Sequence, residues 1–194
     1  MLAGRLPRLG DRSRDLSIIW SKIKGPRESI AVVVATAFGA GLLPVMPGTW
    51  GTLAAIPLAF VTRNLSFEAR LFMWVAITAV GTWAARVLDQ AFGSSDNQSI
   101  VIDEVIGYGI TAWTAGAHPV NILAAFALFR AFDILKPPPV RQADRWSKKK
   151  AAQTDSALAS WWGGFGVLLD DILAGFYGLF VMLLLQKAGL LPAA

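Results

Sequence analysis

Two pairs of adjacent carboxylates interrupt apolar runs of this chain and constrain its fold more than any other feature. The pairs are Asp103 with Glu104 and Asp170 with Asp171, and three aliphatic residues precede each pair. An unpaired charge in an apolar environment is so unfavourable that these groups must be paired, protonated or bound to a cation. Asp103 and Asp171 are each followed four residues later by a glycine, on the same face of a helix. That spacing leaves room for a ligand or for a neighbouring backbone.

The composition favours a membrane-associated protein of one domain. The chain has 194 residues, of which 55% are hydrophobic and 16% are charged, whereas about 25% are charged in an average soluble domain. The mean hydropathy is +0.51. A length of this order is enough for one domain.

Basic residues gather in two segments, residues 1–28 and Lys136–Lys150, within a net charge of +5. Basic segments beside apolar helices favour anionic membrane lipids as partners and the cytoplasmic side of a membrane. The chain contains no nucleic-acid recognition motif, so nucleic acid is not an expected partner. We interpret residues 1–28 as a mobile basic arm, with a helix lying on anionic lipid as the alternative, and residues 29–194 as a single helical domain.

The apolar runs predict an all-α fold, a compact multi-helix integral membrane bundle with re-entrant or broken helices around a carboxylate site. Residues 29–62 are two uncharged runs broken by prolines and glycines at 44–52, which is typical of a re-entrant hairpin or of two short helices around a loop. Residues 71–87 and 167–186 approach or match the length of a membrane span, about 20 residues. The second of these would hold Asp170 and Asp171 in its first turns, where a helix dipole favours negative charge.

Shorter helices and loops are predicted for the rest of the chain. Helices are expected over residues 100–115 and 120–135, the second ending at the triple proline 137–139. Residues 147–160 are predicted to form an exposed loop or short helix, and residues 161–166 a flexible segment.

The residue types exclude several chemistries. The chain has no cysteine and one histidine, His118, which is expected in an exposed turn. Disulfides, thiolate sites and two-histidine mechanisms are therefore excluded. Clusters of carboxylate oxygens suit a hard cation such as Mg²⁺. Arginine and lysine near them suit a phosphate, and Thr49, near glycines at a helix start, suggests an anion cradle or a plain turn.

Two rival interpretations remain open at this point. The charged residues could be buried ion pairs that hold helices together, as the spacing of Arg130 and Asp133 alone would permit. Alternatively, carboxylates within the membrane could form the path of an ion- or proton-coupled transport protein. A CDP-alcohol phosphotransferase is a weaker alternative, because the long aspartate signature of those enzymes is absent.

Four blocks of sequence, in order, resemble the phosphatidylglycerophosphatase A family. They are residues 41–53, residues 100–107, residues 129–139 with Asp144 and Arg145, and residues 163–175. The resemblance implies a mostly helical, Mg²⁺-dependent phosphatase of bacterial membranes. With the basic segments, it predicts a place in the bacterial cytoplasmic membrane, with the active site facing the cytoplasm. It implies a reaction that converts phosphatidylglycerophosphate to phosphatidylglycerol and inorganic phosphate.

The resemblance also implies roles for particular residues. Asp103, Glu104, Asp170 and Asp171 resemble metal ligands or the base that activates water, with Asp103, Glu104 and Asp171 as the catalytic set. Asp133 resembles a further ligand or the residue that orients Arg130 and Lys136. Binding of the phosphate or headgroup is implied for Arg130, Lys136 and Arg141, and a place in the pocket wall for Gly48 and Thr49. The chain departs from the family at residues 146–162, a longer connection than expected, which we interpret as an insert that contacts the membrane.

Overall fold

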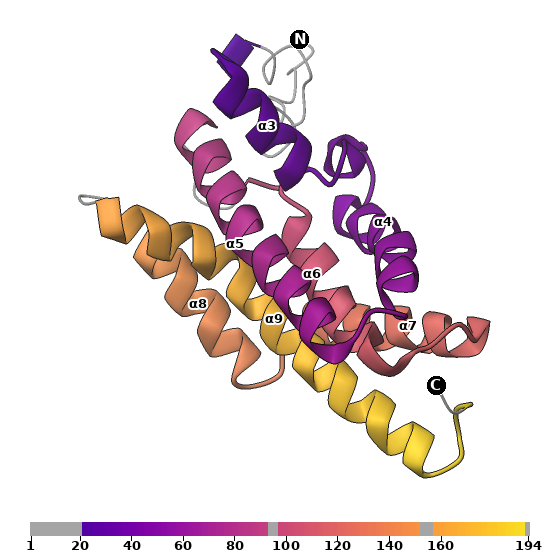
Figure 1. Cartoon of the computed structure of the whole chain (residues 1–194). Helices are drawn as coiled ribbons and strands as arrows, with labels where there is room; N and C mark the ends of the chain where they lie inside the picture. The colour runs from indigo at the N-terminus through magenta and orange to yellow at the C-terminus, as the bar shows by residue number, and fades with distance from the viewer. Residues whose placement is uncertain (1–20, 93–96, 152–156, 193–194) are drawn as a thin grey trace, which may run out of the picture.

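The computed structural model describes residues 21–92, 97–151 and 157–192, which form helices joined by short loops (Figure 1). Within these residues there is no strand, so the all-α prediction is confirmed. The elements are α3 (Pro26–Ala35), the 3₁₀ turn η1 (Ala40–Leu42), α4 (Pro47–Thr62), α5 (Phe67–Phe92), α6 (Ile102–Thr111), the 3₁₀ turn η2 (Ala112–Thr114), α7 (Pro119–Leu135), α8 (Val140–Ala151) and α9 (Ala157–Lys187).

Helices α5 and α9 are the long elements of the bundle and pack against each other (Figure 1). Residues Phe67–Phe92 and Gly164–Lys187 are long and apolar enough to cross a membrane, with hydropathies of 1.6 and 2.0. At a rise of about 1.5 Å per residue, each exceeds the ~30 Å of a hydrocarbon core. The two predicted long helices are thus confirmed, and both extend beyond their predicted ends.

The run over residues 29–62 forms two short helices, α3 and α4, around a loop that contains η1. The segment before α6 lies against the end of α3, where the backbone N–H of Val101 donates to the carbonyl of Ala35 at 2.8 Å. Gly41 in η1 lies against the same segment, since a Cβ built on it would stand 2.1 Å from the carbonyl oxygen of Ser99. These contacts place the start of α4 next to the start of α6.

Helix α6 is short and contacts α4, α5, α7 and α9. It meets α9 at two glycines, since a Cβ built on Gly175 would lie only 2.6 Å from the carbonyl oxygen of Gly107. A Cβ on Gly107 would in turn lie 2.7 Å from the carbonyl oxygen of Asp171. The small residues that follow the carboxylates therefore make room for a neighbouring backbone, and the two helices approach closely.

The predicted start of the last helix was wrong. Helix α9 begins at Ala157 rather than Val167, so Asp170 and Asp171 lie about four turns inside it and gain nothing from its N-terminal dipole. Residues 161–166, predicted to be flexible, are helical. Gly164 suits this helix because a Cβ there would lie 2.7 Å from the carbonyl oxygen of Thr82 in α5.

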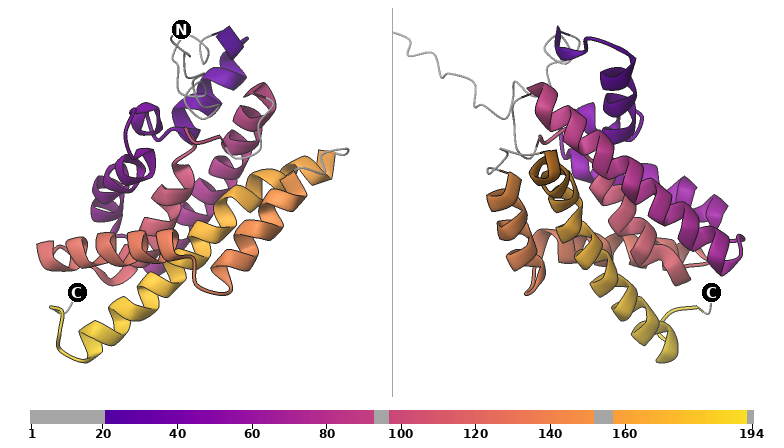
Figure 2. Two further views of the ribbon diagram at one scale, coloured as in Figure 1. Left: turned by 180° about the vertical axis from the view of Figure 1, so that it is seen from behind. Right: turned by 60° about the vertical axis from the view of Figure 1, so that its left-hand side comes forward.

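The predicted basic arm and insert lie partly outside the described residues, at 1–20 and 152–156. The described part of the insert belongs to the end of α8 and the beginning of α9. Both views in Figure 2 show α8 running beside the first half of α9.

Candidate active site

Members of both carboxylate pairs meet where α6 crosses α9. One oxygen each from Asp103, Glu104 and Asp171 lies within 4.8 Å of the other two. Asp103 and Glu104 occupy the first turn of α6, and Asp171 faces them from α9. The close glycine crossing of the two helices one turn further along makes this convergence possible.

The three carboxylates are shielded from water to different degrees. Asp171 is 4% exposed, and Asp103 and Glu104 are half-buried. The Oε2 atom of Glu104 is buried and has no hydrogen-bond partner among the described residues. Oδ1 of Asp103 accepts a hydrogen bond from the backbone N–H of Glu104 at 3.0 Å.

Burial and mutual repulsion favour the protonated forms of Asp103 and Glu104 when no cation is near. Burial raises the pKa of Asp103 well above its usual range, and repulsion from Glu104 adds to the rise. Burial likewise raises the pKa of Glu104 to about 8, with further repulsion from Asp171 and Asp133. A bound cation would reverse this preference, since ligating carboxylates are ionised.

The residues present fit a hard divalent cation. The donors are oxygens only, as Mg²⁺ prefers, and one buried oxygen of Glu104 lacks a donor. Asp103, Glu104 and Asp171 would hold such an ion. The two other carboxylates that the sequence suggested as ligands, Asp133 and Asp170, lie in ion pairs with Arg130 and Lys136, and their role as ligands stays a prediction.

Two cationic side chains flank the carboxylates. Nη1 of Arg130 in α7 lies 2.7 Å from Oδ2 of Asp133 and 3.8 Å from Oε1 of Glu104. The Nζ atom of Lys136 donates to Oδ2 of Asp170. Lys136 ends α7 in the left-handed conformation, with φ 43°. The site therefore combines a carboxylate cluster with positive charge at its edge, as binding of a metal and a phosphate together requires.

The first turn of α4 forms one wall of this site. A Cβ built on Gly48 would lie 2.2 Å from Oε1 of Glu104 and 2.9 Å from Nη1 of Arg130. Thr49 follows it and is partly exposed. The hydroxyl of Thr52 donates to the carbonyl of Gly48 at 2.7 Å, so it is committed to the helix rather than to an anion.

Arg141 does not join the group in this structure. It is exposed in the first turn of α8, and the structure describes no ion pair between it and the carboxylates. His118 is exposed at the start of α7, as predicted, where its Nδ1 accepts a hydrogen bond from the N–H of Val120 at 3.2 Å.

One contributing residue was not found by sequence reasoning. The hydroxyl of Tyr177 donates to the carbonyl of Pro138 at 2.7 Å, and its ring lies 5.5 Å from that of Phe132. It thus ties the proline loop after Lys136 to α9. The available signal was its position seven residues after Asp170, two turns along the same helix face.

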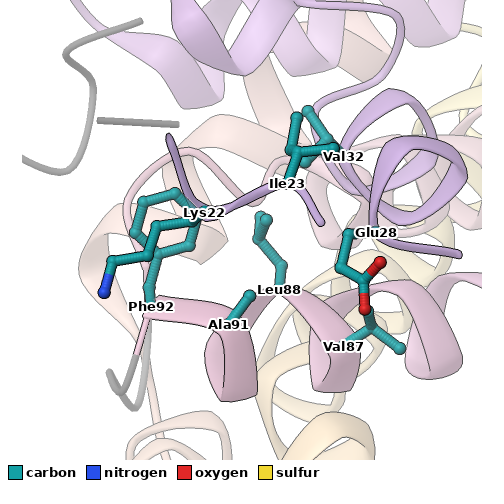
Figure 3. A pocket seen from close by; sticks show the side chains of 8 residues that line it. All are labelled: Lys22, Ile23, Glu28, Val32, Val87, Leu88, Ala91 and Phe92. Atoms are coloured by element: carbon teal, nitrogen blue, oxygen red, sulfur yellow. The ribbon is translucent and has the colours of Figure 1, made fainter. Parts of the chain in front are cut away.

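A separate hollow between α3 and the end of α5 holds none of the site residues (Figure 3). Its lining is mostly apolar, with Lys22 and Glu28 as its charged members. It offers no carboxylate cluster and no phosphate-binding pair.

Comparisons with known proteins agree with this chemistry. The family model described as Phosphatidylglycerophosphatase A matches residues 33–186. Proteins named Phosphatidylglycerophosphatase A from Haemophilus influenzae and Escherichia coli are 34% and 33% identical to this chain. The alignments cover 79% and 84% of this chain and 87% and 86% of those proteins.

A Bacteroides thetaiotaomicron protein named as a candidate phosphatidylinositol-3-phosphatase is 37% identical over 76% of this chain and 88% of its own length. No solved structure matches the chain. All three relatives carry the name of a phosphatase that acts on a phospholipid.

Proposed function

Because this chain belongs to the phosphatidylglycerophosphatase A family, we propose that it hydrolyses the phosphomonoester of phosphatidylglycerophosphate, with Mg²⁺ as cofactor. The products are phosphatidylglycerol and inorganic phosphate. The observation that carries the proposal is the convergence of Asp103, Glu104 and Asp171 beside Arg130. The alternative of a transport protein is not favoured, since the family is one of phosphatases.

Charge explains why a cation is needed. In the described part of the chain, two cationic side chains, Arg130 and Lys136, form ion pairs with this group of five carboxylates, which comprises Asp103, Glu104, Asp133, Asp170 and Asp171. An ionised site of this kind would repel a phosphate monoester. Bound Mg²⁺ would supply the missing positive charge and polarise the phosphoryl group.

The side chains of the site have separate roles in the reaction. Asp103, Glu104 and Asp171 hold the cation, and a carboxylate of this group accepts the proton of the attacking water. Arg130 and Lys136 bind phosphate oxygens, and their partners Asp133 and Asp170 orient them. As water attacks phosphorus, the bond from phosphorus to the lipid oxygen breaks. The carboxylate gives the proton that it took from water to this oxygen, which leaves as the hydroxyl of phosphatidylglycerol.

We place the protein in the bacterial cytoplasmic membrane, with the site toward the cytoplasm. Helices α5 and α9 expose large apolar side chains, among them Phe72 at 77% and Phe180 at 59%, which acyl chains would cover. The basic helix α8 follows Lys136 directly, and basic segments favour the cytoplasmic side and anionic lipids.

The test is release of inorganic phosphate from phosphatidylglycerophosphate by detergent-purified protein. Asp103→Asn and Asp171→Asn should each lower the rate by about 100-fold, because loss of a ligand weakens the metal site at least as much as loss of its supporting residues. Glu68→Gln changes an exposed carboxylate on α5 and should leave the rate unchanged. Near-normal rates in both aspartate variants would refute the proposal.

A further inference from the structure

The end of α6 farthest from the carboxylates is held by side chains from both long helices. Arg70 of α5 donates from Nη1 to the carbonyl of Trp113 at 2.8 Å and from Nη2 to that of Ala112 at 3.4 Å. Gln186 of α9 donates from Nε2 to the carbonyl of Thr114 at 2.6 Å. Carbonyls at the end of a helix often lack partners within it. Here side chains bind three consecutive carbonyls of η2, although that of Ala112 also accepts from the N–H of Ala115 at 3.1 Å.

Arg70 is an unusual residue for this place. It is 6% exposed, and among the described residues no carboxylate pairs with it. Its guanidinium carbon lies 4.3 Å from the centre of a ring of Trp113. Burying this charge is unfavourable unless its donors are satisfied. The carbonyls of η2, at the C-terminal end of α6, accept from Nη1 and Nη2, whereas Nε is buried without a hydrogen-bond partner among the described residues.

Between this end and the carboxylates, α6 is closely packed along its length. A Cβ on Gly109 would lie 2.2 Å from the indole of Trp74, and one on Gly81 would lie 2.9 Å from Ile102. The hydroxyl of Thr111 bonds to the carbonyl of Gly175 at 3.1 Å. A ten-residue helix spans about 15 Å, so a shift at its C-terminal end moves its first turn as well.

We propose that Arg70 and Gln186 are positioning residues for the metal site. By binding the carbonyls of η2, which directly continues α6, they set the position of α6 along its axis relative to α5 and α9. That position determines whether Asp103 and Glu104 meet Asp171 at the spacing that a cation needs. The proposal rests on the cation of the proposed function, and neither residue touches the reacting atoms.

The test measures binding of Mn²⁺ to the full-length protein in detergent by electron paramagnetic resonance, without substrate. Arg70→Met should weaken Mn²⁺ binding roughly tenfold or more, the range for residues that orient metal ligands. Gln186→Leu should weaken it less, because one hydrogen bond is lost. Arg70→Lys should recover part of the affinity, because its ammonium can donate to the same carbonyls.

Arg63→Met is the matched control, because Arg63 ends α4 close in sequence to Arg70 and bonds only to the carbonyl and ring of Phe60 in the described structure. Its Mn²⁺ affinity should equal that of the wild type. Wild-type affinity in folded Arg70→Met and Gln186→Leu would overturn the proposal, even if both melt at lower temperature. If Arg70→Met does not fold, Gln186→Leu decides alone.

Failure of the proposed function would look different. If the wild-type protein binds Mn²⁺ but releases no phosphate from phosphatidylglycerophosphate, the proposed reaction is wrong. The Mn²⁺ affinities of the variants then still decide whether Arg70 and Gln186 position the metal site. In an active enzyme, Arg70→Met should raise the Mg²⁺ concentration for half-maximal activity and leave KM for the lipid at saturating Mg²⁺ unchanged.

Discussion

Gly48, in the first turn of α4, lies so close to Glu104 on α6 that a Cβ built on it would stand 2.2 Å from the Oε1 atom of that carboxylate. The same Cβ would stand 2.9 Å from Nη1 of Arg130. The backbone of α4 is therefore one wall of the site, and only a residue without a side chain fits there.

Gly48→Ala should reduce phosphate release by about 10- to 100-fold, because the new methyl group must displace a metal ligand or the arginine beside it. The helical fold should remain, as circular dichroism would check. Gly25→Ala is the control, since a Cβ there meets only the carboxylate of Glu28 at an ordinary 3.4 Å. Equal rates in both variants would contradict the placement of Gly48.

Lys136→Asn should raise KM for the lipid roughly tenfold, because it removes a charged partner of the phosphate, while Asn tolerates the left-handed backbone at this position. Lys136→Arg keeps the charge and should retain more activity. Steady-state kinetics at saturating Mg²⁺ measures KM for the lipid in both variants. An unchanged KM in Lys136→Asn would show that Lys136 serves only its pair with Asp170.

The metal-free protein should lose stability as pH rises. The pKa of Glu104 is about 8 in the folded protein, whereas the ordinary pKa of a glutamate is 4.5. Between these two pH values, the folded state therefore holds more protons than the unfolded state. The free energy of unfolding is then highest below about pH 4.5 and falls as pH rises toward 8.

Mg²⁺ should raise the melting temperature more at about pH 8 than at about pH 5, because it binds ionised carboxylates. Thermal unfolding in detergent measures both effects, and Glu104→Gln should flatten the pH dependence. A melting temperature of the metal-free protein that rises over this range would contradict the described burial of Glu104.

Gly175→Ala should destabilise the protein by about 1–3 kcal/mol, the usual cost of an overpacked contact, because its Cβ would lie 2.6 Å from the carbonyl oxygen of Gly107. Phe176→Ala removes a neighbouring side chain that is 55% exposed and should change stability much less. Denaturant or thermal unfolding compares them, and equal stabilities would contradict the close crossing of α6 and α9.

Features encoded by local chemistry could be predicted from the sequence. Prolines 44 and 47 break the apolar run 29–62, so α3 and α4 were expected as separate helices. The glycines four residues after Asp103 and Asp171 indicated room for a ligand or for a neighbouring backbone, and in the structure a backbone fills that room.

Features that depend on packing between distant segments could not be predicted. Residues 161–166 contain three glycines, which have low helix propensity, yet they continue α9 because Gly164 packs against the backbone of α5. Similarly, five carboxylates were suggested as ligands. Their division into a cluster of three and two ion pairs follows from how α6, α7 and α9 are oriented.

The most direct measurement is phosphate release from phosphatidylglycerophosphate as Mg²⁺ is removed by a chelator and then restored. Release should stop in the chelator and return with Mg²⁺ in the wild type, whereas Asp103→Asn and Asp171→Asn should each stay about 100-fold slower after Mg²⁺ is restored. Full activity in the chelator would contradict the claim that Asp103, Glu104 and Asp171 work by holding a cation.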